Sequence, residues 1–226
     1  MKLTYYGQAC FAVAINGKKI LFDPFIKPNP LAKHINVDEI EADFIFLSHG
    51  HGDHLSDLID IAKRTGATCV GAAEVAGWFG KNGIEKIHPL NHGAPVEFDF
   101  GKVRAVNAIH SSSFPDGSYA GNPLGFVFTT SQGNFYYSGD TALTMDMQLI
   151  TRWAKLDFSV LPIGGNYTMD VADALIAAEF VNCNTVVGVH YNTFDIIKID
   201  TEKAIADFKT AGKTLLLPAI GETINI

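Results

Sequence analysis

Three histidines and one aspartate lie within six consecutive residues in the stretch Ser-His-Gly-His-Gly-Asp-His, residues 48–54. The four side chains are those of His49, His51, Asp53 and His54. Imidazole and carboxylate groups are the ligands that bind zinc and similar divalent ions. The two intervening glycines permit backbone conformations that let all four side chains converge on one point. The stretch predicts a metal site, and the alternative is a surface cluster of histidines without a ligand.

Three more potential ligands, His110, Asp140 and His190, recur farther along the chain. Each stands where a predicted β-strand opens into a loop, and these strands are residues 103–109, 135–137 and 185–189. Loops at strand ends are where layered α/β folds build metal and substrate sites. This recurrence argues against a chance surface cluster, because five of the eight histidines occupy such positions.

The remaining histidines, His34, His88 and His92, lie in loops or turns without a supporting pattern. We treat them as ordinary, with His92 a candidate for the rim of the site. The chain has three cysteines, Cys10, Cys69 and Cys183, and each lies in or beside an apolar segment. They are far apart in the sequence and form no Cys-x-x-Cys. We therefore predict small buried side chains in a reducing compartment.

Predicted strands and helices, which must position these side chains, alternate along the chain. An apolar run at residues 43–47 predicts a buried strand directly before the first motif. Apolar residues at helical spacing then predict a helix over residues 55–65, closed by Gly66. Further strands are expected at 3–6, 10–15, 19–22, 67–71, 85–88, 95–98, 124–130, 156–162 and 214–217, and further helices at 74–81, 143–154, 171–181 and 201–211. Residues 26–36 are proline-rich and should form a loop.

Composition limits the classes of protein that remain. The 226 residues are 47% hydrophobic and 18% charged, which allows a substantial core and argues against disorder. We expect one domain over residues 1–226. The net charge of −7 argues against a nucleic-acid partner, which would require a basic face. No signal-peptide pattern and no apolar run of about 18 residues is present, so we expect a cytoplasmic protein without a membrane partner.

The order of these seven positions resembles the metallo-β-lactamase superfamily, whose motif His-x-His-x-Asp-His is followed by separate His, Asp and His residues. Two segments look like those of its small metal-dependent hydrolase branch, which is related to the ascorbate-6-phosphate lactonases. They are Ser-Gly-Asp-Thr at 138–141 and Pro-Ile-Gly-Gly-Asn-Tyr-Thr-Met at 162–169. The chain departs from the pattern of that branch at Gln8, where the branch usually has a histidine after the glycine that is Gly7 here. The resemblance implies an α/β (α+β) fold, a four-layer αββα sandwich with the site at one edge between two sheets.

The resemblance also implies a division of the ligands between two metal ions. One ion would be held by His49, His51 and His110, and the other by Asp53, His54 and His190, with Asp140 bridging them. Asp53 and Asp140 would be catalytic, Asp53 because it would also orient the attacking water and carry a proton to the leaving group. We expect zinc or manganese, and the nitrogen and oxygen ligands also suit iron or nickel.

The residues predicted to contact substrate are fewer. Asn166, in a Gly-Gly-Asn-Tyr turn after a predicted strand, could donate to a substrate oxygen, and the alternative is a turn and helix cap. Residues 111–113 are three serines that could bind a phosphate, although we favour a role in capping their loop.

The expected function is hydrolysis of a small ester, lactone or phosphodiester by a metal-activated water, with a small-molecule substrate and a possible homo-oligomer. One alternative is a mononuclear iron dioxygenase on the same fold. Another is a metal-binding protein without catalysis. The redox diiron relatives replace a ligand of the first motif with glutamate, and the intact His51 and His54 argue against that chemistry here.

Overall fold

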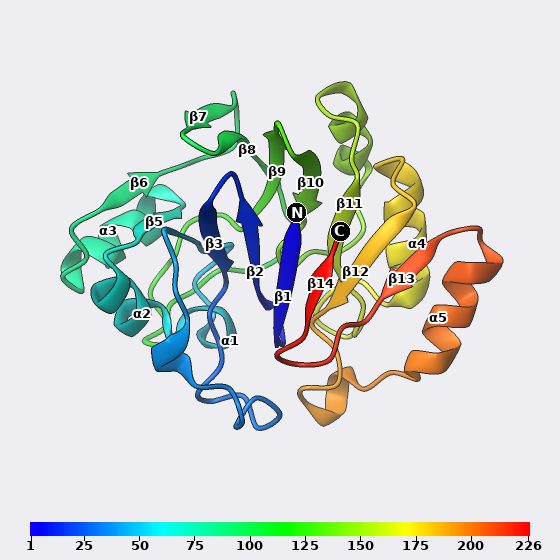
Figure 1. Cartoon of the computed structure of the whole chain (residues 1–226), viewed down its shortest axis with the longest axis horizontal. Helices are drawn as coiled ribbons and strands as arrows, with labels where there is room; N and C mark the ends of the chain where they lie inside the picture. The colour runs from blue at the N-terminus through cyan, green and yellow to red at the C-terminus, as the bar shows by residue number, and fades with distance from the viewer.

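Two seven-stranded β-sheets pack face to face in the computed structural model, which describes residues 1–226, and helices cover their outer sides (Figure 1). The first sheet contains, in spatial order, β14 (Thr223–Asn225), β1 (Lys2–Gly7), β2 (Cys10–Ile15), β3 (Lys18–Phe22), β4 (Phe44–Phe46), β5 (Thr68–Gly71) and β6 (Ile87–Pro89). The second contains β13 (Thr214–Leu216), β12 (Thr185–Val189), β11 (Phe158–Pro162), β10 (Gly133–Tyr137), β9 (Leu124–Thr130), β8 (Gly101–Asn107) and β7 (Val96–Phe98).

Five α-helices and three 3₁₀ helices complete the layers. The α-helices are α1 (Gly52–Leu55), α2 (Leu58–Thr65), α3 (Ala73–Lys81), α4 (Val171–Phe180) and α5 (Thr201–Thr210). The 3₁₀ helices are η1 (Val37–Glu39), η2 (Met145–Arg152) and η3 (Asp195–Ile197). Figure 1 shows α2 and α3 beside the strands β5 and β6, and α4 and α5 on the far side of the second sheet. The predicted four-layer αββα sandwich is therefore confirmed.

Aromatic side chains fill the space between the two sheets. Phe22 of the first sheet lies 5.4 Å from Phe128 and 5.5 Å from Tyr137 of the second, measured between ring centres. Edge-on aromatic pairs of this kind contribute about 0.5–1.5 kcal/mol each beyond the area they bury. These contacts hold the two sheets in a fixed relation, so the loops at their shared edge meet in a defined geometry.

The predicted helix over residues 55–65 is wrong in one respect, because the chain forms two helices there. Asp57 separates α1 from α2, and its buried carboxylate accepts hydrogen bonds from the backbone N–H groups of Ile26 and Lys27 at 2.6 and 2.9 Å. These bonds tie the junction to a distant loop and interrupt the regular helix. The predicted cap at Gly66 is confirmed, with φ at 68°.

Three other expectations need correction. The helix expected over 143–154 is the 3₁₀ helix η2, which follows Thr144, whose hydroxyl accepts from the backbone N–H of Asp146. The strand expected to run to residue 109 ends at Asn107, because the N–H of Ile109 donates to the Thr141 hydroxyl at 2.9 Å. The edge strand β14 was not expected, since its three residues carry no pattern.

The cysteines are free and buried as predicted. No helix has the length and apolar character needed to cross a membrane.

Candidate metal centre

Both sheets contribute to the predicted ligand set. His49 follows β4 in the first sheet, and His51 directly precedes α1, whose first residues include Asp53 and His54. The other three predicted ligands follow strands of the second sheet and are His110 after β8, Asp140 after β10 and His190 after β12. The loops that carry all seven side chains meet at the edge between the sheets, as expected from the strand-end pattern.

His49, His51 and His110 form one group of potential ligands. Their ligand atoms lie within 4.8 Å of one another. The Nε2 atom of His49 lies 2.9 Å from the Nδ1 atom of His51, and the ring centre of His110 is 5.1 Å from each of their ring centres. Three imidazoles at this separation can share one ion, which is the grouping expected from the resemblance.

Asp53, His54 and His190 form the second group, again within 4.8 Å of one another. The Asp53 carboxylate lies 3.7 Å from Nε2 of His54 and 3.5 Å from Nε2 of His190. His190 has an unusual backbone for its residue type, with φ at 56°. Its N–H donates to the carbonyl of Gln8 at 2.8 Å, which stabilises this conformation.

Asp140 lies between the two groups. Its Oδ2 atom is 3.0 Å from Nε2 of His190, 3.2 Å from Nε2 of His54 and 3.8 Å from Nε2 of His110. The side chain is only 3% exposed. A buried carboxylate within reach of both groups is in the position that a bridging ligand would need.

The buried donors fit a divalent cation. The Nδ1 atom of His54 donates to Asp23 at 2.8 Å, so the imidazole in its neutral form directs the Nε2 lone pair at two carboxylates. That Nε2 atom is buried and forms no hydrogen bond. A lone pair facing two carboxylates is unfavourable unless a proton or a cation lies between them. Burial alone lowers the pKa of His54, but the carboxylates of Asp140 and Asp53 raise it well above its usual value.

Asp23 orients the ligands without belonging to either group. Its carboxylate is fully buried and accepts four hydrogen bonds, from the N–H and hydroxyl of Ser48 at 2.8 and 2.5 Å, from Tyr137 at 2.5 Å and from His54 at 2.8 Å. A carboxylate can only accept, so the proton of His54 must reside on Nδ1. Hydrogen bonds of this kind fix the tautomer and ring orientation of metal-binding histidines.

The same carboxylate also fixes the tautomer of His49 through Ser48. The single hydroxyl proton of Ser48 is donated to Asp23, so its oxygen must accept from Nδ1 of His49, which is 2.9 Å away. His49 then presents its Nε2 lone pair toward His51. Although Asp23, His49 and His54 also lie within 4.8 Å of one another, the four donors already occupy the Asp23 carboxylate.

Five of the other predicted ligands are shifted toward the protonation states that metal ligands require. Burial lowers the pKa values of His49, His51 and His110, which favours neutral imidazoles. Burial by itself raises the pKa of Asp140, but the nearby imidazoles of His190 and His54 lower it well below its usual value. The pKa of Asp53 is also lowered, chiefly by His54 against the effect of burial.

Gln8 supports Asp53 from the first sheet. Its amide nitrogen donates to Oδ2 of Asp53 at 2.9 Å, and its carbonyl accepts from His190. Gln8 has a positive φ of 53°, which places it on the tight turn between β1 and β2. The residue that departs from the histidine usual in similar proteins thus orients one ligand and the backbone of another.

A cavity of about 530 Å³ opens onto this cluster. Besides five of the predicted ligands it is lined by Ser111 and by Tyr167, Phe194 and Ile196, three partly exposed side chains that sequence reasoning did not select. Asn166 is exposed, does not line the cavity and occupies a turn with φ at 58°, so its substrate contact remains a prediction. The cap of the following helix is Asp170.

The structure also bears on the expectations for the serine loop and for His92. Ser112 accepts from the N–H of Gly50 at 3.2 Å and donates to the carbonyl of Ala120 at 3.2 Å, which agrees with the capping role. His92 is wrong as a rim residue, because it lines a different cavity on the outer face of the second sheet. Asp23 was missed because its only signal was an Asp-Pro pair after an apolar strand, which is typical of any turn.

The sequence and the fold were compared with those of known proteins. A sequence family described as "Beta-lactamase superfamily domain" matches residues 18–191. The chain is 51% identical to a "UPF0173 metal-dependent hydrolase" of Flavobacterium johnsoniae and 50% identical to one of Christiangramia forsetii, in both cases over the full length of both chains. Igni18, a metallo hydrolase of the archaeon Ignicoccus hospitalis, has a similar structure with a TM-score of 0.89 and 33% identity, covering 99% of this chain and 97% of Igni18.

Proposed function

This chain belongs to the metallo-β-lactamase superfamily, and from that premise we propose that it hydrolyses a small ester, lactone or phosphodiester with a metal-activated water. It is a metal-dependent hydrolase, like the relatives it matches over their full length. The observation that carries the proposal is the position of Asp140, with one carboxylate oxygen within 3.8 Å of ligand atoms from both groups.

We propose two divalent ions, zinc or manganese, held by the two groups with Asp140 between them. Bound divalent ions supply a nucleophile at neutral pH by lowering the pKa of water to about 7, and they polarise the scissile carbonyl or phosphoryl group. The chain's own contribution is to favour neutral imidazoles at His49, His51 and His110 and to keep Asp140 ionised.

Asp53 is suited to proton transfer. Its side chain is 28% exposed and lines the cavity, whereas Asp140 is 3% exposed. Oδ2 of Asp53 accepts from Gln8, which holds the carboxylate in place and leaves Oδ1 without a protein donor. We propose that Asp53 orients the attacking water and delivers a proton to the leaving group, in agreement with general acid–base catalysis.

The cavity lining favours an uncharged substrate. The three non-ligand residues with the largest apolar surface are Tyr167, Phe194 and Ile196, and neither lysine nor arginine lines the cavity. A phosphorylated substrate would find only the proposed metal ions to pair with its charge, because no side chain of the lining is a fixed cation. We therefore place esters and lactones with an apolar group ahead of phosphodiesters.

Metal content and hydrolysis, measured on the same preparations, test the proposal. Elemental mass spectrometry on untagged protein should find about two equivalents of zinc or manganese per chain, and the reconstituted protein should hydrolyse an aryl ester or aryl lactone. The Asp140→Ala variant should lose hydrolysis by several orders of magnitude, whereas Asp38→Ala, which removes an exposed carboxylate, should not.

Two outcomes would contradict the proposal. One equivalent of iron with oxygen consumption would favour the dioxygenase alternative. Two bound ions with no turnover of any ester, lactone or phosphodiester would favour a metal-binding protein without catalysis.

A further inference from the structure

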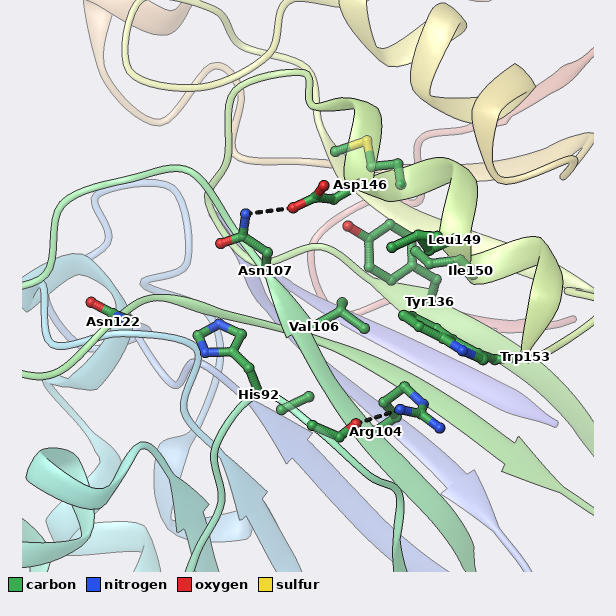
Figure 2. A pocket seen from close by; sticks show the side chains of 13 residues that line it. His92, Arg104, Val106, Asn107, Asn122, Tyr136, Asp146, Leu149, Ile150 and Trp153 are labelled. Atoms are coloured by element: carbon green, nitrogen blue, oxygen red, sulfur yellow. Dashed lines mark hydrogen bonds between the residues drawn. The ribbon is translucent and has the colours of Figure 1, made fainter.

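A second cavity, of about 500 Å³, lies on the outer face of the second sheet between β8 and η2 (Figure 2). It shares no lining residue with the cavity at the metal centre. Its floor includes Val106 of β8, and Met147 and Ile150 of η2 line the side. In Figure 2, His92 and Trp153 stand on opposite sides of Val106, so two aromatic rings flank the apolar floor.

One end of this cavity carries a cation. The guanidinium of Arg104 lies over the ring of Trp153, 4.4 Å from the ring centre, and one of its N–H groups donates to the carbonyl of Gly93. Its other N–H groups donate to no protein acceptor. No carboxylate pairs with Arg104, unlike the neighbouring Lys102, whose ammonium group is 2.9 Å from Glu97. A planar cation held in this way is suited to pair with a carboxylate.

The opposite end is rich in acceptors. The amide nitrogen of Asn107 donates to the Asp146 carboxylate at 2.9 Å, which leaves the Asn107 amide oxygen and the other carboxylate oxygen available (Figure 2). A negative charge would be repelled here, whereas a hydroxyl or amine would find acceptors. The charge pattern therefore gives a bound molecule one orientation, with its anion at Arg104 and its donor at Asp146.

Tyr136 provides a second polar group that lacks a partner. It lines the cavity, is fully buried, and its hydroxyl forms no hydrogen bond in the protein. Figure 2 shows this hydroxyl directed toward the side where Asn107 and Asp146 lie. Burial raises the pKa of Tyr136, so the group remains a hydrogen-bond donor at all physiological pH values. Buried hydroxyls without partners are rare in folded proteins, and bound ligands are one explanation for them.

We propose that this cavity binds a small aromatic carboxylate that carries a hydroxyl or amino group at the far end of its ring. The carboxylate pairs with Arg104, the ring lies over Val106 between His92 and Trp153, and the distal group meets the Asn107–Asp146 pair. This site is independent of the hydrolysis proposed above, because no residue is shared between the two cavities.

The position of Trp153 allows a direct binding assay. The chain has two tryptophans, Trp78 and Trp153, so in a Trp78→Phe background all indole fluorescence comes from the proposed site. Titration with 4-hydroxyphenylacetate should change that fluorescence and saturate at low millimolar concentration or below. The matched alcohol, 4-hydroxyphenylethanol, lacks the carboxylate and should bind at least about tenfold more weakly, as expected for a charge-assisted hydrogen bond.

Matched variants separate the site from general effects of charge. Arg104→Gln should weaken binding of 4-hydroxyphenylacetate about tenfold or more, and Lys102→Gln, which removes an equal charge two residues away on the same strand, should not. Tyr136→Phe should fold at least as well as the parent protein and bind the probe more weakly. A merely structural tyrosine would show the reverse, loss of stability with unchanged binding.

Three results would overturn the proposal. The first is the absence of saturable binding at millimolar concentration. The second is equal affinity in the parent protein and Arg104→Gln. The third is binding that disappears when the protein is treated with a chelator, because the probe would then be occupying the metal centre.

Discussion

Replacing Asp23 with asparagine should weaken metal binding strongly although Asp23 binds no metal in the proposed arrangement. The substitution preserves shape but replaces one carboxylate oxygen with an NH₂ group, which donates. Three donors converge on Oδ2 of Asp23, from Ser48, Tyr137 and His54. We expect the amide oxygen at the Oδ1 position, because the backbone N–H of Ser48 donates there and cannot become an acceptor. The NH₂ group then faces these three groups, and each must find another acceptor or become an acceptor itself.

The consequence for the ligands can be followed atom by atom. His54 can accept from the new NH₂ group only if its proton moves from Nδ1 to Nε2, the atom directed at Asp140 and Asp53. If Ser48 turns to accept as well, it loses its role as acceptor for Nδ1 of His49. A wrong tautomer at either histidine removes a metal-binding lone pair. Loss of such an orienting partner typically costs about 10- to 100-fold in metal affinity, which is about 1.4–2.8 kcal/mol.

Competition with a chromophoric chelator measures this change. Asp57→Asn is the matched control, because Asp57 is also a buried carboxylate, 2% exposed, but its two hydrogen bonds come from backbone N–H groups outside the metal centre. It should lower stability to denaturant while leaving metal affinity within about twofold. Equal metal affinity in Asp23→Asn and in the parent protein would refute the tautomer argument, as would an equal loss in Asp57→Asn.

Three further outcomes are expected. Tyr137→Phe removes one of the four donors to Asp23 and should reduce metal affinity in the same chelator assay by less than Asp23→Asn does. Gly164→Ala would place a Cβ atom 2.2 Å from the carbonyl oxygen of His190, so denaturant unfolding should show a loss of about 1–3 kcal/mol or more. In the metal-free protein, Asp140 helps raise the pKa of His190 to about 9 against the effect of burial, from an ordinary value of 6.5. The stability this gives is full below pH 6.5 and lost as pH rises to about 9, so thermal unfolding should show that loss without metal and a smaller one with metal bound.

The seven predicted ligands could be selected from the sequence because each selection depends on local features. His110, Asp140 and His190 follow apolar strands, and four ligands lie in one short motif, so type and position along the chain were enough. Their assembly at one edge followed from general rules for layered folds.

The groups that orient the ligands could not be predicted in this way. The role of Asp23 depends on its distance from Tyr137, which is 114 residues away in the sequence. Gln8 contacts Asp53 across 45 residues. The break between α1 and α2 also depends on a long-range contact, between Asp57 and the backbone at Ile26. No periodicity or local propensity encodes such contacts, so they appear only when the two sheets are packed together.

The origin of the ligands on both sheets has a consequence for assembly of the protein. His49, His51 and His54 lie on the half of the chain that forms the first sheet, and His110, Asp140 and His190 on segments that follow strands of the second. Neither group of three is complete until the two sheets have docked, because each contains a residue from both. A bound ion would therefore act as a late cross-link between the halves of the sandwich. Removal of the ion by a chelator should therefore lower the free energy of unfolding of the docked sandwich.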